Sequence, residues 1–383
     1  MKTIYLVTRA KSTSGPINQA LNILNGMRMN GRVNSWLVTL EPEKEGLSWL
    51  QKFHDADMPV YQFNQSFFPT FFCVFKLRRY LKQNKIEVVH SSGFRANIVS
   101  LLSGTKAKKV ITQRCHPLDI AEKFPPKLRP IISTFYMKLI KKADAVVACS
   151  KSIQNIFRDK YQMDIYAVQN GVNTSFFKPV AEEQKKELRK KLGLPIDKTI
   201  YLVLGTLIAR KNNKVAVEAF KRLNLKDSVL LFVGEGNEES MLKELAGNNP
   251  NIIFAGVTKT PLIYQQASDF LISCSLGEGL PNTVLEALSC GLPCILSDIG
   301  PHQEIIAGTK AGIIFSRDSV DDLCGAIMKS QEWDINEKSK NARNLAESNF
   351  SVNILAEKYE RIYNIVLNEK GTNYTCNENS KSL

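Results

Sequence analysis

The chain has 383 residues, 44% of them hydrophobic and 23% charged. This is ordinary globular usage, which excludes a wholly disordered, collagen-like or coiled-coil protein, and the length favours about two to three domains. The charge is uneven: residues 1–178 carry 27 basic and 11 acidic residues, and residues 179–383 carry 24 and 26. The basic part favours an anionic partner, either nucleic acid, an anionic membrane or a phosphorylated ligand.

The cysteines and the N-terminus exclude several protein classes. Eight cysteines are scattered without a C-x2-C pair, and there are only four histidines, so we expect neither a disulfide framework nor a zinc site. A reducing compartment follows from this cysteine usage. The opening MKTIYLVTRA lacks a cleavage site and predicts a first strand rather than a signal peptide. No apolar run is long enough for a transmembrane helix.

Apolar runs alternate with helical patterns along the chain. Strands are predicted at 3–8, 33–39, 88–90, 110–112, 145–148 and 165–168, and again at 200–204, 228–233, 252–254, 270–273 and 294–297. Helices are predicted at 17–29 and 74–83, and then at 215–222, 238–245, 282–288 and 320–329. This alternation is typical of parallel sheets covered on both faces, so the sequence predicts two doubly wound α/β domains.

The domain boundary falls near 173–195, where a charged, helix-prone run reads AEEQKKELRKKLGLP. We therefore predict a first domain at 1–178 and a second at 179–349. Apolar residues at helical spacing predict a last helix at 350–367. The remaining residues, 368–383, are polar and predict a disordered tail.

The most informative segment follows the predicted strand 270–273 and contains Glu278 and Glu286. Glycines form a tight turn, and Pro281 suits the first turn of a helix. Backbone N–H groups of Asn282 and Thr283 at that helix start suit a diphosphate, whereas the two carboxylates suit hydroxyl groups of a sugar and a ribose. An ordinary helix with solvated glutamates remains the alternative reading of these residues alone.

The full string EGLPNTVLEALSCGLPC resembles the Glu-x7-Glu signature, approximately EGxPxxxxEAxxxGxPV, of the retaining nucleotide-sugar-dependent glycosyltransferases of the GT-B fold. These are the glycosyl transferases group 1, which are similar to glycosyltransferase family 4. The resemblance implies two Rossmann-like domains facing a central cleft. It also implies that the helix at 350–367 crosses back and packs on the first domain.

Other segments extend the resemblance. YLVLGTLIARKN, residues 201–212, resembles the family's loop whose basic residues grip the donor diphosphate, with Thr206 where the family often has Arg. Residues 12–17, STSGPI, resemble the family's Gly-rich loop beside the donor. In residues 110–117, VITQRCHP, His116 follows a predicted strand, as a histidine does in the family. FAGV, ending at Val257, resembles the loop that holds the base. NGVNTSFFKP resembles the segment before the linker, and His90 in HSSGFRAN is read as structural.

The resemblance implies a role for each matching residue. The catalytic residues would be Glu278, His116, Arg210 and Lys211. The substrate-binding residues would be Gly15, Gly205, Val257, Gly279, Leu280, Pro281, Asn282, Thr283 and Glu286. Glu286 would hold ribose hydroxyls and Glu278 donor-sugar hydroxyls, while the cations stabilise the leaving diphosphate. The implied reaction is front-face substitution with retention, without a cofactor or a metal.

The acceptor side is predicted on the basic first domain. Residues 67–80, FFPTFFCVFKLRRY, and residues 125–142 mix aromatic with basic side chains. This mixture suits an anionic membrane, although core aromatics beside solvated lysines would give the same pattern. The resemblance favours a cytoplasmic enzyme, peripheral on the inner face of the cell membrane. Its acceptor would be a lipid-linked saccharide in bacterial O-antigen, capsule or exopolysaccharide synthesis.

Two other functions remain open from the sequence. One is a nucleotide-sugar epimerase on the same fold, which would need no acceptor. The other is a nucleic-acid-binding protein that uses the basic half, although no nucleic-acid-binding motif accompanies the charge. We therefore expect a nucleotide sugar and a saccharide acceptor as partners, and no nucleic acid.

Overall fold

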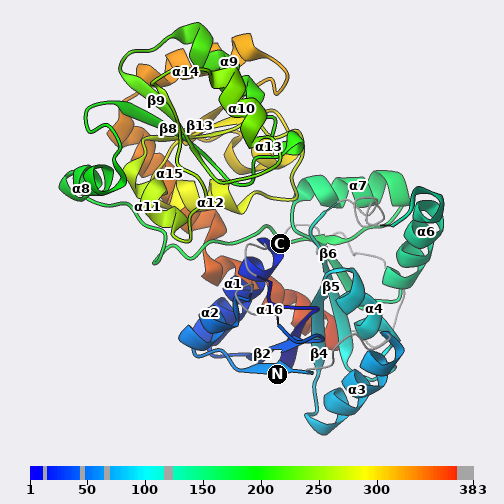
Figure 1. Ribbon diagram of the computed structural model, residues 1–383. Coiled ribbons are helices and arrows are strands. Elements are labelled where there is room, and N and C mark those ends of the chain that lie inside the picture. The colour runs from blue at the N-terminus through cyan, green and yellow to red at the C-terminus, as the bar shows by residue number, and fades with distance from the viewer. Residues whose placement is uncertain (12–14, 44–47, 64–69, 116–123, 369–383) are drawn as a thin grey trace. The chain divides into compact units, whose positions relative to one another are not determined.

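The chain divides into two separately packed units (Figure 1). In the computed structural model, which describes residues 1–11, 15–43, 48–63, 70–115 and 124–368, unit 1 is Met1–Gly171 together with the chain from Val352, and unit 2 is Val172–Ser351. The predicted boundary between residues 178 and 179 lies a few residues after this division. The predicted disordered tail lies, from residue 369, outside the described residues.

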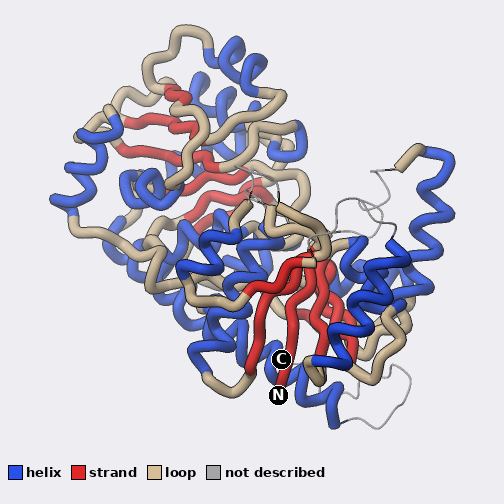
Figure 2. The backbone as a smooth tube through the Cα atoms, turned by 60° about the horizontal axis from the view of Figure 1, so that its bottom comes forward, coloured by secondary structure: helices blue, strands red, loops and turns tan. Residues whose placement is uncertain are grey.

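Unit 1 is a parallel sheet with helices on both faces (Figure 2). Its strand order is β3-β2-β1-β4-β5-β6-β7. Its elements are β1 (Lys2–Val7), α1 (Gly15–Asn30), β2 (Asn34–Thr39), α2 (Leu50–Asp55), β3 (Val60–Gln62), α3 (Thr70–Gln83), β4 (Val88–Ser92), α4 (Phe94–Leu102), β5 (Lys108–Gln113), the 3-10 turn η1 (Pro126–Leu128), α6 (Arg129–Ile140), β6 (Ala145–Ala148), α7 (Lys151–Tyr161), β7 (Tyr166–Ala167) and α16 (Val352–Asn368).

Side chains along β1 point alternately to the two faces of the sheet, and apolar residues on both faces require helices on both. Tyr5 and Val7 point into a core shared with α1 and α16, whereas Ile4 and Leu6 point into a core shared with α3 and α4. Helices α1 and α16, from opposite ends of the chain, lie side by side (Figure 1). A Cβ on Gly26 of α1 would lie 2.4 Å from the Val352 carbonyl oxygen, so only glycine permits this approach.

Unit 2 repeats the architecture with the strand order β10-β9-β8-β11-β12-β13, all parallel. Its elements are α8 (Glu182–Leu192), β8 (Thr199–Leu204), the 3-10 turn η2 (Ala209–Lys211), α9 (Lys214–Leu223), β9 (Ser228–Val233), α10 (Glu239–Ala246), β10 (Ile252–Phe254), α11 (Pro261–Ala267), β11 (Phe270–Ser273), α12 (Asn282–Ser289), β12 (Cys294–Ser297), α13 (Gly300–Ile306), β13 (Gly312–Phe315), α14 (Val320–Gln331) and α15 (Ile335–Phe350).

The predicted strands and helices are present, with ends that differ by a few residues. Two strands were not predicted, β3 and β13, each at an edge of its sheet. The last helix starts at Val352 rather than at residue 350, since Phe350 is the last residue of α15. Among the described residues, no helix is both long and apolar enough to cross a membrane.

Candidate active site

A small pocket lies where the strand order of unit 2 reverses, at the carboxyl ends of β8 and β11. Ligands of open α/β sheets bind at such points because the loops of the two strands diverge there. Side chains and backbone from β8, β11, their following loops and the start of α12 line it. These are Val203, Leu204, Gly205, Thr206, Lys211, Asn213, Leu271, Ile272, Ser273, Ser275, Pro281, Thr283 and Val284.

The carboxylate of Glu278 gathers the charged groups beside this pocket. Its Oε2 lies 2.9 Å from Arg210 Nη1, and its Oε1 lies 2.7 Å from Lys211 Nζ. The Ser275 hydroxyl donates to the same Oε1 at 2.9 Å. Arg210 Nη1 also donates to the carbonyl oxygen of Gly277. Three of the four predicted catalytic residues are thus in contact, with two cations on one carboxylate.

Burial and these cations act on the Glu278 pKa in opposite directions. The Glu278 side chain is only 11% exposed, and burial by itself raises the pKa. The charges of Lys211 and then Arg210 outweigh this effect and hold the pKa below its ordinary value. Glu278 is therefore ionised at neutral pH, and the trio keeps one net positive charge.

Two glycines let the loops after β8 and β9 meet at the pocket. Gly205 has a φ of 138°, which a side chain would strain. A Cβ on Gly234 would lie 1.9 Å from the Gly205 carbonyl oxygen. Gly205 was a predicted binding residue and lines the pocket, whereas a role for Gly234 follows from this close approach alone.

Helix α12 points its N-terminus at the same pocket. Pro281 is the residue that precedes the helix, not a residue of its first turn as predicted, because its ψ of 112° is extended. Thr283 lines the pocket, and the helix dipole places positive charge there. Gly279 and Leu280 lie in the preceding loop, and Asn282 begins the helix. Glu286 lies in its second turn, half-buried.

The remaining predicted site residues lie elsewhere. Val257 is an exposed residue of the loop after β10. Gly15 is the first residue of α1 in unit 1. His116 lies outside the described residues. His90 is fully buried in unit 1, where its ring contacts the hydroxyls of Thr112 and Tyr363, which fits its structural reading.

Four polar residues of the pocket were not predicted. They are Thr206, Asn213, Ser273 and Ser275, and Ser275 also contacts Glu278. They lie at or just after the end of a strand or turn, near predicted residues, and this position is the signal that could have found them. No group of three or more His, Cys, Asp or Glu side chains that could hold a metal ion occurs within the described ranges. Metal independence stays a prediction.

Exposed aromatic and aliphatic side chains mark another surface, on unit 1. On α3, Phe71, Phe72 and Phe75 are 64%, 52% and 51% exposed, while Cys73 and Leu77 face the core. On η1 and α6, Leu128, Ile131 and Phe135 are also exposed. Both helices contact α4, which lies between them (Figure 1). The predicted residues 67–69 lie outside the described residues.

Two family models match the chain and together span most of it. The model "Glycosyl transferases group 1" matches residues 184–348, and the model "Glycosyltransferase Family 4" matches residues 18–176. The chain belongs to the group 1 glycosyltransferases. The expectation from the Glu-x7-Glu string is thereby confirmed at the level of the family.

Curated relatives of this glycosyltransferase come from archaea and bacteria. An uncharacterized glycosyltransferase of Methanocaldococcus jannaschii is 28% identical, over 62% of this chain and 64% of its own length. The Escherichia coli UDP-Gal:alpha-D-GlcNAc-diphosphoundecaprenol alpha-1,3-galactosyltransferase is 25% identical, over 75% and 77%. The Campylobacter jejuni N,N'-diacetylbacillosaminyl-diphospho-undecaprenol alpha-1,3-N-acetylgalactosaminyltransferase is 25% identical, over 83% and 89%.

Solved structures share the fold of this glycosyltransferase. A glycosyltransferase from Rickettsia africae has a TM-score of 0.79 at 20% identity, covering 96% of this chain and 99% of its own. Anabaena HepE, solved in complex with UDP, has a TM-score of 0.78 at 16% identity, covering 95% and 100%. The two-domain α/β GT-B fold expected from the sequence is confirmed.

Proposed function

We propose that this glycosyltransferase moves a sugar from a nucleotide diphosphate sugar to a hydroxyl group of a lipid-linked saccharide, with retention and without a metal. The carrying observation is the cluster of Glu278, Arg210 and Lys211 beside the pocket at the N-terminus of α12. A carboxylate, two cations and a helix dipole supply together what a sugar and a diphosphate need.

Each group has a distinct part in the proposed reaction. As the bond from the sugar to the diphosphate breaks, negative charge grows on the leaving phosphate oxygens, and Lys211, Arg210 and the α12 N-terminus stabilise it. Glu278 holds sugar hydroxyls, and Glu286 holds those of the ribose. The leaving phosphate oxygen takes the proton of the attacking hydroxyl, so no protein nucleophile is needed. His116 would contact the donor sugar.

The names of the relatives support the choice of substrates. The E. coli relative is named for a UDP-sugar donor, and both it and the C. jejuni relative are named for acceptors linked to a polyprenyl diphosphate. We therefore propose a UDP-sugar as the first donor to test and a diphosphate-linked lipid saccharide as the acceptor. Such an acceptor would place the enzyme at the inner face of the bacterial membrane, in surface polysaccharide synthesis.

The exposed side chains of unit 1 support the membrane assignment. Phe71, Phe72 and Phe75 on α3 are followed on the same helix by exposed Arg78 and Arg79. Aromatic groups insert at the headgroup level while cations attract anionic lipids, so this surface, the α3–α6 surface, suits an anionic bilayer.

Nucleotide binding tests the proposed donor site. We expect UDP, from a panel of nucleoside diphosphates in a thermal-shift screen, to raise the melting temperature of the wild type. Lys211→Met should weaken UDP binding at least tenfold in calorimetry, because it removes a charge-assisted contact to the diphosphate. Lys214→Met, an exposed lysine three residues along, is the matched control and should bind like the wild type.

The Glu278→Gln variant separates nucleotide binding from sugar transfer. The variant should bind UDP at least as tightly as the wild type, since Lys211 and Arg210 lose a competing anion, yet it should turn over a donor sugar roughly a hundredfold more slowly. Weaker UDP binding in Glu278→Gln would contradict the assignment.

Interconversion of the donor sugar without acceptor would indicate an epimerase. Salt-sensitive RNA binding without any nucleotide response would indicate a nucleic-acid-binding protein.

A further inference from the structure

A fully buried histidine, His302, lies behind the donor pocket in the first turn of α13. Its Nδ1 is 2.9 Å from the carbonyl oxygen of Ser297, the last residue of β12. Its Nε2 is 3.4 Å from the hydroxyl of Ser273, the last residue of β11. Ser273 lines the pocket, so His302 contacts the pocket wall from the core side.

The contacts of the ring assign its tautomer. A carbonyl oxygen can only accept, so Nδ1 carries the proton and donates to Ser297. Burial lowers the pKa of His302 to about 4, which keeps the ring neutral at neutral pH. In the neutral ring Nε2 is then an acceptor, and the hydroxyl that faces it, that of Ser273, donates to it.

The proton of the neighbouring Ser275 hydroxyl is used elsewhere. This hydroxyl donates to Glu278 Oε1, so it has no proton for the Ser273 oxygen, which lies 3.4 Å away. The Ser297 hydroxyl donates to the Ser275 carbonyl at 2.7 Å and so fixes the same loop a second time. Ser275 and Ser297 are fully buried, so water does not compete for these bonds.

We propose that His302 is a positioning residue for the donor site. As a neutral acceptor it directs the Ser273 proton away from the pocket and so fixes the orientation of that hydroxyl. Because the Ser273 proton is committed to the ring, its oxygen presents only lone pairs to the pocket. That oxygen can accept from a hydroxyl of the bound donor but cannot donate to a phosphate oxygen, which restricts this wall to the sugar or ribose.

This inference rests on the proposed function, and paired variants of His302 test it. Asn at this position keeps a donor near Nδ1 but loses the acceptor at Nε2, whereas Gln places an acceptor near Nε2. We expect His302→Asn to slow turnover of UDP-galactose or UDP-glucose about tenfold, with UDP affinity within about twofold of the wild type. His302→Gln should recover most of the turnover.

A double-mutant cycle with the pocket serine separates positioning from a loss of packing. Ser273→Ala should slow turnover by the same factor as His302→Asn, and the double variant should be no slower, because both changes break the same hydrogen bond between Ser273 and His302. Ser268→Ala removes a buried hydroxyl before the amino end of β11 and is the control that should turn over like the wild type. Equal losses in Asn and Gln variants, or additive losses in the double variant, would overturn the proposal.

Nitrogen-15 spectra of the histidine rings supply a readout that needs no turnover. The chain has only four histidines, and His302→Asn identifies the signal of this ring. We expect the neutral tautomer with the proton on Nδ1 from pH 8 to pH 6, and an Nε2 shift that changes in Ser273→Ala. A proton on Nε2 would overturn the inference. If the wild type bound no UDP and acted on neither sugar nucleotide, the proposed function would fail, and the spectra would still decide the tautomer.

Discussion

Glu278 shows how one side chain draws its properties from two loops. The family resemblance implied that Glu278 holds donor-sugar hydroxyls and that Arg210 and Lys211 together stabilise the diphosphate, and these roles stay predictions. In the structure both cations contact the carboxylate directly. The carboxylate thus holds both cations beside the pocket, where it would compete with a bound diphosphate for them.

The lowered pKa of Glu278 predicts how stability depends on pH. The ordinary value is 4.5, and the folded value lies below it because Lys211 and Arg210 outweigh burial. The contribution of this cluster is thus present above pH 4.5 and is lost as the pH falls through the folded pKa. The melting temperature of Glu278→Gln, which mimics the protonated form, should lie below that of the wild type at pH 7 and approach it as the pH falls below 4.5. A difference that does not shrink would contradict this.

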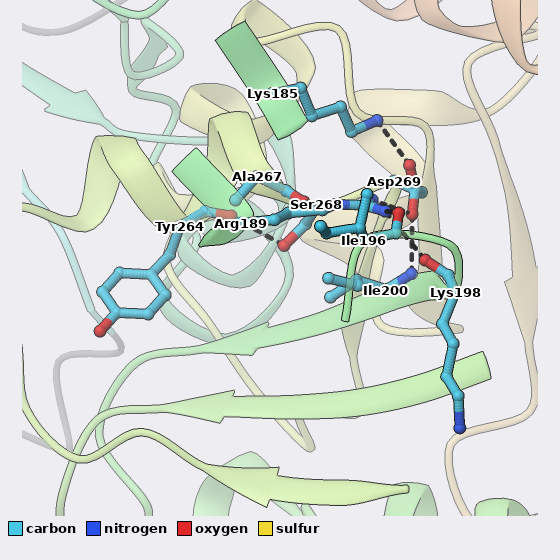
Figure 3. A network of polar contacts seen from close by, with 9 residues as sticks. All are labelled: Lys185, Arg189, Ile196, Lys198, Ile200, Tyr264, Ala267, Ser268 and Asp269. Carbon is cyan, nitrogen blue, oxygen red and sulfur yellow. Dashed lines mark hydrogen bonds and ion pairs between the residues drawn. The ribbon is translucent and has the colours of Figure 1, made fainter. Parts of the chain in front are cut away.

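Helix α8 is fixed to the sheet of unit 2 by a buried polar cluster (Figure 3). The Asp269 carboxylate, just before β11, accepts from Lys185 Nζ at 2.5 Å, Arg189 Nη2 at 2.6 Å and the Ile200 backbone N–H at 2.7 Å. Arg189 also donates to the carbonyl oxygens of Ala267, Ile196 and Lys198, so four of its five N–H groups are hydrogen-bonded within this cluster. One helix and two neighbouring strands are joined by this cluster.

Removing the carboxylate of this cluster should destabilise unit 2. Asp269→Ala leaves the buried Arg189 without its anion, which should cost about 3 kcal/mol in the free energy of unfolding. Asp227→Ala, at an exposed aspartate, should change it by less than about 0.5 kcal/mol. Urea unfolding followed by Trp333, the one tryptophan of unit 2, measures both if Trp36 and Trp49 are replaced by Phe in every variant. Equal effects of the two substitutions would contradict a special role for the cluster.

The net charge of the chain is concentrated in its first half. The structure shows that exposed aromatic side chains accompany this positive charge. Residues 1–178 hold the excess of basic residues, and the exposed aromatics of the α3–α6 surface lie on the same unit. The charged groups of the proposed donor site belong instead to the nearly neutral unit 2. We therefore connect the overall charge with the acceptor side rather than with the nucleotide.

Vesicle binding tests this division of charge. The wild type should bind vesicles that contain phosphatidylglycerol and not vesicles of phosphatidylcholine alone. Reversing Arg78 and Arg79 to Glu should weaken binding at least tenfold, since each cation near an anionic surface contributes about 1 kcal/mol. Reversal of Lys186 and Lys190 on α8 is the matched control, with equal charge change on unit 2. Binding that ignored anionic lipid, or equal losses in both variants, would contradict the α3–α6 assignment while leaving the donor site untouched.

Local pattern was enough for the fold class, and the resemblance carried by the Glu-x7-Glu string pointed to a loop and a helix that the structure places beside the pocket. Buried parallel strands are continuous apolar runs, and the Glu-x7-Glu spacing lies within one loop and one helix, so both are visible in short segments. The edge strands β3 and β13 escaped prediction because Gln62 ends the first and Gly312 begins the second, and neither residue type favours a strand as valine or isoleucine does.

The contacts between distant segments could not be inferred in this way. Glu278 meets Arg210 and Lys211 because β8 and β11, far apart in the chain, are neighbours where the strand order reverses. His302 meets Ser273 because β12 lies beside β11 and α13 folds back over their ends. Spacing along the chain describes one strand and the loop that follows it. A pocket built from several loops depends on which strands lie side by side. Only the packing of the complete sheet determines that order.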